Sequence, residues 1–216
     1  MEWRLLEDVP VEQVRELLQV ARRRRFSRNE VVFHREDPGD SLHLISKGRF
    51  AIQVMTPLGD TATIAVRGPG ESFGEMALIG GTRRSATVLA LEESETFSIY
   101  QPEFERVRRQ HAGVSDVLIR FLVSEVRMLN ERLLEALYVP VERRVLRRLV
   151  ELAELYPSAD GVPVITLTQE AIAELAGAAR PTVNQVLREE EKRGTIELSR
   201  GKTRILDLVG LRKRAR

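Results

Sequence analysis

The sequence contains no cysteine among its 216 residues. It therefore has no disulfide, no thiolate zinc site, no cysteine nucleophile and no cysteine-ligated iron–sulfur cluster. Only three histidines are present, His34, His43 and His111, and no two of them have the HxH or HxxxH spacing of a metal site. We expect no bound metal and no histidine-based catalysis, and we expect these histidines to lie on surfaces or in loops.

Long apolar runs are also missing. No segment approaches the ~18–20 consecutive apolar residues of a transmembrane helix. The N-terminal stretch MEWRLLEDVP lacks the apolar core of a signal peptide. The 43% of hydrophobic residues is nevertheless typical of a globular chain, and the length allows one to two domains. We expect a cytoplasmic protein without a membrane segment.

The charges are balanced in total but not along the chain. Residues 1–137 hold 19 basic and 21 acidic side chains, whereas residues 138–216 hold 15 basic and 11 acidic ones. The final stretch, SRGKTRILDLVGLRKRAR, carries seven basic residues and one acidic residue. A basic segment behind a mildly acidic one indicates a polyanionic partner, and a solvated tail is the alternative.

Between about residues 30 and 100 the sequence is typical of an all-β module. Turn-forming residues separate short alternating or β-branched runs, which are VVFH, LHLI, FAIQV, TATIAV, SATVLAL and TFSIY. Many short strands at near-regular spacing predict a small antiparallel sandwich or barrel-like roll. An amphipathic helix is expected before this module, over residues 10–23.

Residues 101–137 have helical periodicity and contain an apolar seam. Spacings of three and four join the residues of this seam, which are Ile119, Leu122, Val126, Leu129, Leu133 and Ala136. Such a heptad pattern suits pairing with a helix of a second chain. The opposite face is also apolar, at Phe121, Met128 and Leu134, and a helix apolar on two faces needs two partners. We expect a dimer helix, and a helix buried within its own chain is the alternative.

Pro140 follows this helix and predicts a hinge, because proline interrupts helical hydrogen bonding. Beyond it the pattern predicts three helices and two short strands, over residues 143–155, 168–176, 180–193, 195–198 and 203–208. The C-terminal part is therefore expected to be a small helical module that ends in a hairpin around Arg200, Gly201 and Lys202.

The stretch from Phe73 to Val88, FGEMALIGGTRRSATV, has the chemistry of a phosphate cradle. Gly74 lets backbone N–H groups approach a ligand, and the short helical turn EMALI offers free N–H groups at its N-terminus. Arg84 can neutralise a phosphate through paired hydrogen bonds. The carboxylate of Glu75 would repel a phosphate, so it needs another role, such as accepting a hydrogen bond from a sugar hydroxyl.

The stretch from Leu167 to Arg188, LTQEAIAELAGAARPTVNQVLR, predicts a helix-turn-helix. Thr168 is a polar N-cap, Gly177 permits the tight turn, and Pro181 is acceptable in the first turn of the second helix. The helices are expected to bury five apolar residues, Ile172, Leu175, Val183, Val186 and Leu187. The second helix would expose side chains that suit base edges and phosphates, namely Arg180, Thr182, Asn184, Gln185 and Arg188. A generic helical hairpin is the alternative.

The first motif resembles the phosphate-binding cassette of cyclic-nucleotide-binding domains, and GDSLHLISKG (residues 39–48) resembles the turn and strand that this family places before it. The resemblance implies that Glu75 binds the ribose 2′-hydroxyl, that Arg84 pairs with the cyclic phosphate, and that Ser85 donates to it. The ligand-binding residues that it implies in this motif are Gly74, Glu75, Met76, Ala77, Arg84 and Ser85. A degenerate cassette without a ligand is the alternative.

Both motifs, in this order and joined by a long apolar helix, resemble the cyclic-AMP receptor branch of the CRP/FNR family of transcription regulators. The resemblance covers nearly the whole chain. It implies an α+β fold with three parts: an N-terminal cyclic-nucleotide-binding β-roll of jelly-roll type (a double-stranded β-helix) over 1–112, a long dimerisation helix over 113–138, and a C-terminal winged helix-turn-helix over 139–216. The absence of cysteine favours this branch over the iron–sulfur branch.

The same resemblance implies a homodimer with cyclic AMP as its effector. The dimer would read a pseudo-palindromic site on double-stranded DNA and activate transcription together with RNA polymerase. Effector binding is expected to act through the dimer helix and the hinge near Pro140.

Two departures from the family's pattern affect specificity. Hydroxyl residues of the dimer helix usually meet the adenine, but the corresponding stretch here is Met128-Leu129-Asn130-Glu131, so Asn130 would make this contact alone. In the second helix of the helix-turn-helix, Arg180 matches the family's base-reading arginine, whereas Pro181 replaces an acidic residue and Gln185 a basic one. The full set of expected DNA contacts is Thr168, Gln169, Arg180, Thr182, Asn184, Gln185 and Arg188.

Under this interpretation the protein is not an enzyme. Three alternatives to it remain open. The first is a ligand-independent or differently liganded regulator of the same fold. The second is the regulatory subunit of a cyclic-nucleotide-dependent kinase, against which the helix-turn-helix argues. The third is a metabolic enzyme, which no clustered histidines or paired carboxylates support.

Overall fold

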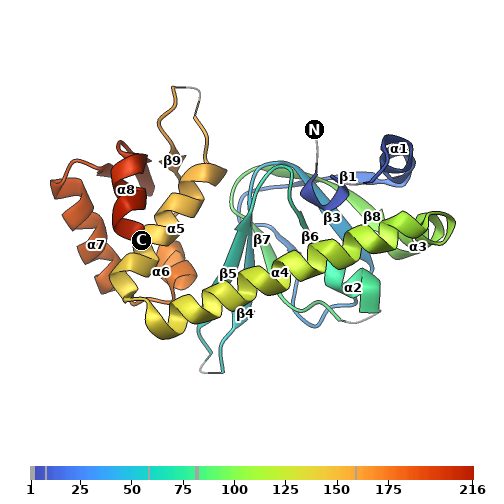
Figure 1. The fold of residues 1–216 in the computed structure, drawn as a ribbon, viewed down its shortest axis with the longest axis horizontal. Coiled ribbons are helices and arrows are strands. Elements are labelled where there is room, and N and C mark those ends of the chain that lie inside the picture. The colour runs from blue at the N-terminus through green and yellow to red at the C-terminus, as the bar shows by residue number, and fades with distance from the viewer. Residues whose placement is uncertain (1–2, 8, 58, 81–82, 159) are drawn as a thin grey trace. The chain divides into compact units, whose positions relative to one another are not determined.

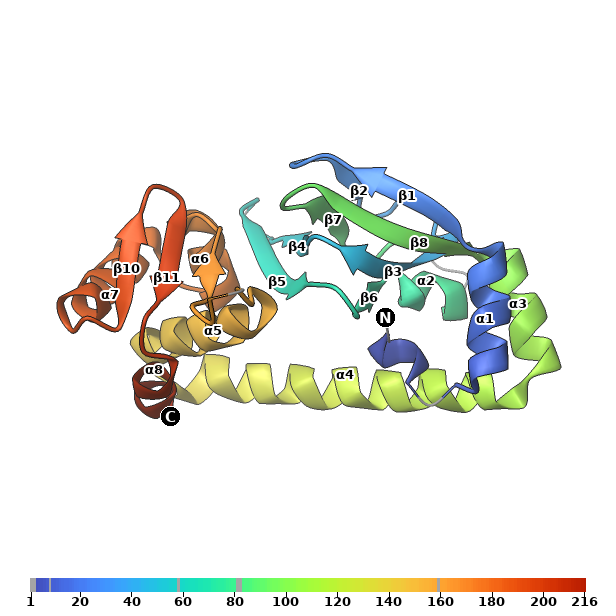
Figure 2. The same cartoon turned by 90° about the horizontal axis from the view of Figure 1, so that it is seen from above.

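The computed structural model describes residues 3–7, 9–57, 59–80, 83–158 and 160–216. Two compact units are present: an N-terminal unit of residues up to 54 together with 65–129, and a C-terminal unit of residues 55–64 together with 130–216. Their helices and strands are seen in two orthogonal views (Figures 1 and 2). Within the described residues, no helix is long and apolar enough to cross a membrane.

The N-terminal unit is built on two four-stranded sheets. The first holds strands in the order β1 (Arg22–Phe26), β8 (Ser94–Tyr100), β3 (Ser41–Lys47) and β6 (Ser72–Phe73), all antiparallel to their neighbours. The second holds β2 (Val31–Phe33), β7 (Thr87–Ala90), β4 (Phe50–Met55) and β5 (Thr61–Arg67). Neighbouring strands come mostly from distant parts of the sequence, as in a roll. The expected β-roll is therefore confirmed.

Two apolar clusters fill this unit. One lies within the roll and contains Phe26, Phe50 and Phe73. The other contains Leu17, Phe104 and further residues of the helices packed on the sheet. These helices are η1 (Arg4–Leu6), α1 (Val11–Val20), α3 (Gln101–Gln110) and the first part of α4 (Ala112–Tyr138). The stretch 101–137 is thus two helices rather than one, with a break at His111, and α1 lies beside α3 (Figure 2).

Strand β1 was not predicted from the sequence. It consists of four arginines followed by Phe26, so it has no apolar alternation. Within the described strands it pairs with β8 only and forms the edge of its sheet, where charged side chains prevent pairing with other chains. Glu95 of β8 binds two of these arginines, with 2.6 Å between its Oε2 and Nη2 of Arg23 and 3.4 Å between the same oxygen and Nε of Arg25.

The expectation that the histidines lie on surfaces or in loops is wrong for His43. Its side chain is buried in β3, and its ring stacks on Phe73 with 4.9 Å between centroids and 8° between planes. Its Nδ1 lies 3.1 Å from Oγ1 of Thr96, and its Nε2 lies 3.4 Å from Oγ of Ser41. Burial, followed by the charges of Arg84 and Arg24, lowers the pKa of His43 to about 3, so the ring is neutral.

Helix α4 has apolar side chains on two faces, but the face opposite the seam is only partly as expected: Phe121 and Met128 are partly buried, whereas Leu134 is 56% exposed. One face packs on its own unit through the buried residues Val114, Val117 and Leu118. Most of the heptad seam is exposed on the single chain: Ile119, Val126, Leu129 and Leu133 are each 55–59% exposed. Burial within its own chain therefore accounts for the first face, and the seam has the exposure that a pairing helix needs.

The C-terminal unit contains four helices beyond α4 and a small sheet within its described residues. Its helices are α5 (Val141–Leu155), α6 (Gln169–Ala176), α7 (Arg180–Lys192) and α8 (Leu208–Ala215). The antiparallel sheet has the order β10 (Ile196–Ser199), β11 (Lys202–Ile205) and β9 (Val164–Ile165). The β10–β11 hairpin turns at Arg200 and Gly201, as expected for a wing. The winged helix-turn-helix is therefore confirmed.

Helix α8 was not predicted, and the alternative of a solvated basic tail is wrong. Asp207 caps this helix by accepting a hydrogen bond from the backbone N–H of Gly210 at 2.8 Å, and Leu211 and Ala215 are buried. Arg214 donates to the buried carboxylate of Glu190 on α7 at 2.5 Å. Burial alone would raise the pKa of Glu190, but hydrogen bonds from Arg214, Thr195 and Arg193 outweigh it and lower the pKa.

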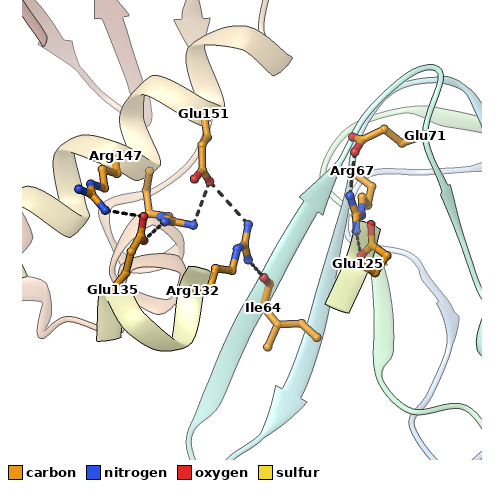
Figure 3. Close-up of polar contacts among 9 residues, drawn as sticks. Ile64, Arg67, Glu71, Glu125, Arg132, Glu135, Arg147 and Glu151 are labelled. Carbon is orange, nitrogen blue, oxygen red and sulfur yellow. Dashed lines mark hydrogen bonds and ion pairs between the residues drawn. The ribbon is translucent and has the colours of Figure 1, made fainter. Parts of the chain in front are cut away.

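An ion-pair network braces the junction of α4 and α5 around Pro140. Glu135 of α4 binds two arginines of α5, with 2.8 Å between its Oε1 and Nη1 of Arg147 and a second bond to Arg148 (Figure 3). Arg148 is 5% exposed and also binds Glu151, with 2.9 Å between Nη1 and Oε2. The last turn of α4 is therefore held to α5 by a buried cation.

Candidate functional site

The predicted phosphate cradle begins at a strand-to-helix turn. β6 ends at Phe73, and α2 (Glu75–Gly80) starts directly after Gly74. Gly74 has a φ of +88°, which only glycine adopts without strain. A Cβ atom at this position would also lie 2.8 Å from the carbonyl oxygen of Ser41. Both the backbone conformation and the close approach therefore require glycine here.

Arg84 is buried next to this turn and is only 3% exposed. Its Nη1 donates to the carbonyl oxygens of Ser41 at 2.7 Å and Gly74 at 3.2 Å. Its Nη2 donates to Oγ of Ser41 at 2.9 Å and to Oδ1 of Asp40 at 3.1 Å. The guanidinium also lies over the ring of Phe33, 4.0 Å from the centroid. Backbone and side-chain acceptors thus fix Arg84 in the wall of the cradle.

The third nitrogen of this guanidinium, Nε, is unsatisfied. Nε of Arg84 is buried and has no hydrogen-bond partner among the described residues. Burial lowers the pKa of Arg84, although Asp40 and Glu75 oppose this effect. A buried N–H donor without a partner is costly, and an anion would supply the missing acceptor. The cradle therefore fits a phosphate.

Charges of both signs act on Glu75, the first residue of α2. Burial raises the pKa of Glu75, the charge of Glu125 adds to this effect, and Arg67 and Arg84 oppose it. Arg67 binds Glu125 with 2.6 Å between Nη2 and Oε2 (Figure 3). The structure thus brings Gly74, Glu75 and Arg84 together, with a carboxylate and a guanidinium beside the same glycine turn.

The remaining predicted ligand contacts are Met76, Ala77, Ser85 and Asn130. Oγ of Ser85 donates to Sδ of Met76 at 3.5 Å, and both side chains are exposed. Ala77 lies in α2, but its side chain is outside the described part of the chain. Asn130 is exposed on α4, among the residues of the C-terminal unit.

The helix-turn-helix has the local features that the sequence predicts. Oγ1 of Thr168 accepts a hydrogen bond from the backbone N–H of Ala171 at 3.1 Å, so it caps α6. Gly177 ends α6 with a φ of +57°, and Pro181 lies in the first turn of α7. The expected core positions are buried except Leu175, which is only partly buried.

The predicted base-reading residues lie mostly on the exposed side of α7. Arg180, Asn184, Gln185 and Arg188 are exposed, and Thr182 is partly buried. Nδ2 of Asn184 donates to Oε1 of Gln169 on α6 at 3.0 Å, so these two predicted contacts lie side by side. These side chains present amide and guanidinium groups of the kind that bind base edges.

The wing and the helix-turn-helix share a cleft of about 610 Å³. Thr168 and Arg180 line it from the helices, and Arg200 and Lys202 line it from the β10–β11 hairpin. Two cations of the wing and Arg180 of α7 therefore line the same cleft with one carboxylate, Glu170, whose Oε2 lies 3.7 Å from Nε of Arg180. The excess of positive charge suits the phosphate backbone of nucleic acid.

Sequence reasoning missed several residues that shape the cradle. Asp40, Ser41 and His43 lie in the segment compared with the family's turn and strand, yet their contacts with Arg84 or with each other were not expected. No sequence pattern pointed to Arg67 and Glu125. In a sequence, an isolated arginine and an isolated glutamate 58 residues apart look the same as ordinary surface residues.

A β-roll with a phosphate cradle and a winged helix-turn-helix in one chain define a class of protein, the effector-responsive DNA-binding regulator. Residues 23–111 match the family described as Cyclic nucleotide-binding domain, and residues 143–214 match the Crp-like helix-turn-helix domain. These matches fall on the two units that carry the cradle and the reading helix.

Relatives that align over most of this chain have names of the same class. The chain is 31% identical over 194 residues to a CRP-like cAMP-activated global transcriptional regulator of Mycobacterium tuberculosis, covering 88% of this chain and 87% of the relative. It is 28% identical over 191 residues to the cyclic AMP receptor protein of Thermus thermophilus, covering 88% and 86%. The solved catabolite activator protein of Thermus thermophilus aligns over 98% of both chains, with 26% identity and a TM-score of 0.58.

The chain belongs to the CRP family of transcription regulators, with a cyclic nucleotide-binding domain and a helix-turn-helix DNA-binding domain. Homodimers are typical of this family, and the cyclic nucleotide-binding domain of this chain supports a cyclic nucleotide as its effector. The two relatives described above are transcription regulators by name, and the helix-turn-helix match sets this chain apart from the kinase regulatory subunits considered above.

Proposed function

We propose that the protein is a cyclic-AMP-responsive activator of transcription that binds a pseudo-palindromic DNA site as a homodimer and acts with RNA polymerase. The observation that carries this proposal is the orphaned Nε of buried Arg84 beside Gly74 and Glu75, because a cyclic phosphate supplies an acceptor for Nε and the adjacent ribose hydroxyl can donate to Glu75. Relatives whose names include cAMP activation support the choice of nucleotide.

The proposed roles are as follows. Arg84 and Ser85 bind the cyclic phosphate, Glu75 accepts from the ribose 2′-hydroxyl, and the backbone at Gly74, Met76 and Ala77 supports the ligand. Asn130 contacts the adenine. The proposed parts are residues 1–112 for the effector, 113–138 for dimerisation and 139–216 for DNA.

DNA recognition is assigned to α6, α7 and the wing. Arg180 is proposed to read a guanine, because its guanidinium is exposed at the first position of α7 and suits the O6 and N7 acceptors of that base. The remaining proposed contacts are Thr168, Gln169, Thr182, Asn184, Gln185 and Arg188. The cations of the wing contact phosphates.

The deciding experiment is calorimetry of the full chain with cyclic AMP and with cyclic GMP, followed by DNA binding with each nucleotide and with buffer alone. We expect cyclic AMP to bind and to increase DNA affinity. Arg84→Leu should abolish both effects, whereas Arg83→Leu should keep them, because Arg83 is exposed and donates only to the carbonyl oxygen of Glu36 within the described residues. Equal nucleotide affinity in Arg84→Leu would reject the cradle.

A ligand-independent regulator is the second candidate. Asp40 favours it, since its carboxylate already binds the Arg84 guanidinium in place of a phosphate. Such a protein would bind its DNA site equally tightly with buffer and with either nucleotide.

A further inference from the structure

A buried histidine lies next to the cradle, and the proposed function gives it no role. His43 of β3 is only 2% exposed, and its ring stacks on Phe73, the last residue of β6. Its Nδ1 lies 3.1 Å from Oγ1 of Thr96, and its Nε2 lies 3.4 Å from Oγ of Ser41. The same Ser41 hydroxyl accepts a hydrogen bond from Nη2 of Arg84 at 2.9 Å. One hydroxyl group therefore connects His43 to the arginine of the cradle.

The four terminal N–H groups of Arg84 all have acceptors. Nη1 donates to the carbonyl oxygens of Ser41 and Gly74, and Nη2 donates to Oγ of Ser41 and to Oδ1 of Asp40. Each terminal nitrogen carries two hydrogens, so Nε holds the N–H group that lacks an acceptor among the described residues. Two of the four bonds that orient this guanidinium therefore come from Ser41.

The contacts of the Ser41 hydroxyl indicate which nitrogen of His43 carries the proton. A guanidinium only donates and a carboxylate only accepts, so Oγ of Ser41 accepts from Arg84 and donates its one hydrogen to Oδ1 of Asp40 at 2.9 Å. The contact with Nε2 of His43 is then a second bond that this oxygen accepts. Since the buried ring is neutral, its Nδ1 accepts from the hydroxyl of Thr96.

We propose that His43 is a positioning residue for the effector: as the Nε2–H tautomer it fixes the Ser41 hydroxyl, and this hydroxyl holds Arg84 with Nε left for the cyclic phosphate. The inference rests on the proposed function, in which Arg84 binds that phosphate. It assigns no ligand contact to His43 itself. Thr96 selects the tautomer by donating to Nδ1, so the series of hydrogen bonds runs from β8 through β3 to the cradle.

The first test determines the tautomer in the full wild-type chain. Nitrogen NMR spectra distinguish the protonated from the unprotonated nitrogen of a histidine ring, and the signals of His43 are those that disappear in His43→Gln. We expect a neutral ring with its proton on Nε2 at neutral pH. A proton on Nδ1 would overturn the inference, because Nε2 would then compete with Asp40 for the one hydrogen of Ser41.

The second test uses the two phosphorothioate diastereomers of cyclic AMP, in which sulfur replaces one or the other exocyclic oxygen of the phosphate. An arginine in a fixed position distinguishes them, because sulfur is a weak acceptor. The wild-type protein should bind one diastereomer about fivefold more tightly or better, the value of one hydrogen bond. His43→Phe keeps a ring but loses the bond to Ser41, and should reduce this ratio toward unity. General damage would weaken both diastereomers alike and leave the ratio unchanged.

A double-mutant cycle on cyclic-AMP affinity tests whether His43 acts through Ser41. Ser41→Ala should weaken binding about fivefold or more, and adding His43→Phe should weaken it little further. Fully additive losses would reject the inference, because His43 would then act by another route. His43→Gln is the conservative variant, since its amide nitrogen can donate from a place close to that of Nε2, and it should retain more affinity than His43→Phe.

Ser98→Ala is the matched control. Ser98 of β8 lies opposite His43 in the sheet and is also buried, but its hydroxyl has no hydrogen-bond partner within the described part of the chain. This variant should leave the affinity and the diastereomer ratio unchanged. If the wild-type protein binds neither cyclic AMP nor its phosphorothioates, the proposed function fails and this inference fails with it. If the wild type distinguishes the diastereomers and His43→Phe does so equally, only the inference fails.

Discussion

A Cβ atom at Gly74 would lie 2.7 Å from Nη1 of Arg84, a separation that packed atoms do not tolerate. The turn that starts α2 and the cation that faces the cradle are therefore fitted to each other. The glycine has a steric role here as well as a conformational one.

Gly74→Ala should therefore weaken cyclic-nucleotide binding by about tenfold or more, because Arg84 must move to make room. Gly59→Ala is the control, since Gly59 has a similar φ of +92° but a Cβ added there would meet no described atom within 4 Å. Both variants should lose about 1–3 kcal/mol of folding free energy from backbone strain. Calorimetry and thermal unfolding measure the two effects, and equal nucleotide affinities would contradict the steric role.

Arg180→Ala should lose discrimination at one guanine, at a cost of about 1–3 kcal/mol. Arg200→Ala in the wing should instead weaken binding to all sequences alike and reduce the salt slope by about 1. The measurement is fluorescence anisotropy on a DNA site selected from a random library and on its single-base variants. An Arg180→Ala protein with unaltered base preference would exclude α7 as the reading helix.

Leu133→Glu should dissociate the dimer. Leu133 is 58% exposed on the single chain and lies in the heptad seam, so a second helix would have to bury the new charge unpaired. We expect the dimer dissociation constant to rise about a hundredfold or more in sedimentation experiments. Arg127→Glu places the same charge on an exposed position of α4 outside the seam and should leave the dimer intact. A dimeric Leu133→Glu protein would remove the seam from the interface.

Acidification should destabilise the N-terminal unit through His43. The pKa of His43 is about 3 in the folded chain and about 6.5 when unfolded, so the unfolded state binds one more proton between these values. The contribution of neutral His43 is fully present above pH ~6.5 and is lost as the pH falls toward ~3, by about 1.4 kcal/mol per pH unit. His43→Phe should remove this slope in urea unfolding at several pH values, although it also loses the contacts with Thr96 and Ser41. Parallel slopes in both proteins would disprove the assignment.

The features that sequence reasoning predicted are carried by short, continuous stretches. The turn at Gly74 and the cap at Thr168 each depend on residues within about ten positions, so their chemistry can be recognised without knowing the fold. The seam of α4 is likewise a local periodicity, and its exposure agrees with the spacing from which it was predicted.

The features that were missed depend on neighbours brought together by folding. Arg84 binds Asp40 and Ser41, more than 40 residues earlier, only because the crossing strands of the roll place them there. Strand β1 exists because β8 pairs with it, not because RRRRF favours a strand. A solvated tail was considered for the segment of helix α8 because its many basic residues outweighed its few apolar ones. Two of those apolar residues, Leu211 and Ala215, are buried.

The bonds between Glu135 and the arginines of α5 join the two sides of Pro140 through side chains as well as through the backbone. Bending at Pro140 would separate Glu135 from Arg148, which would keep Glu151 of its own helix as a partner. These ion pairs therefore oppose bending at the expected hinge without making it impossible.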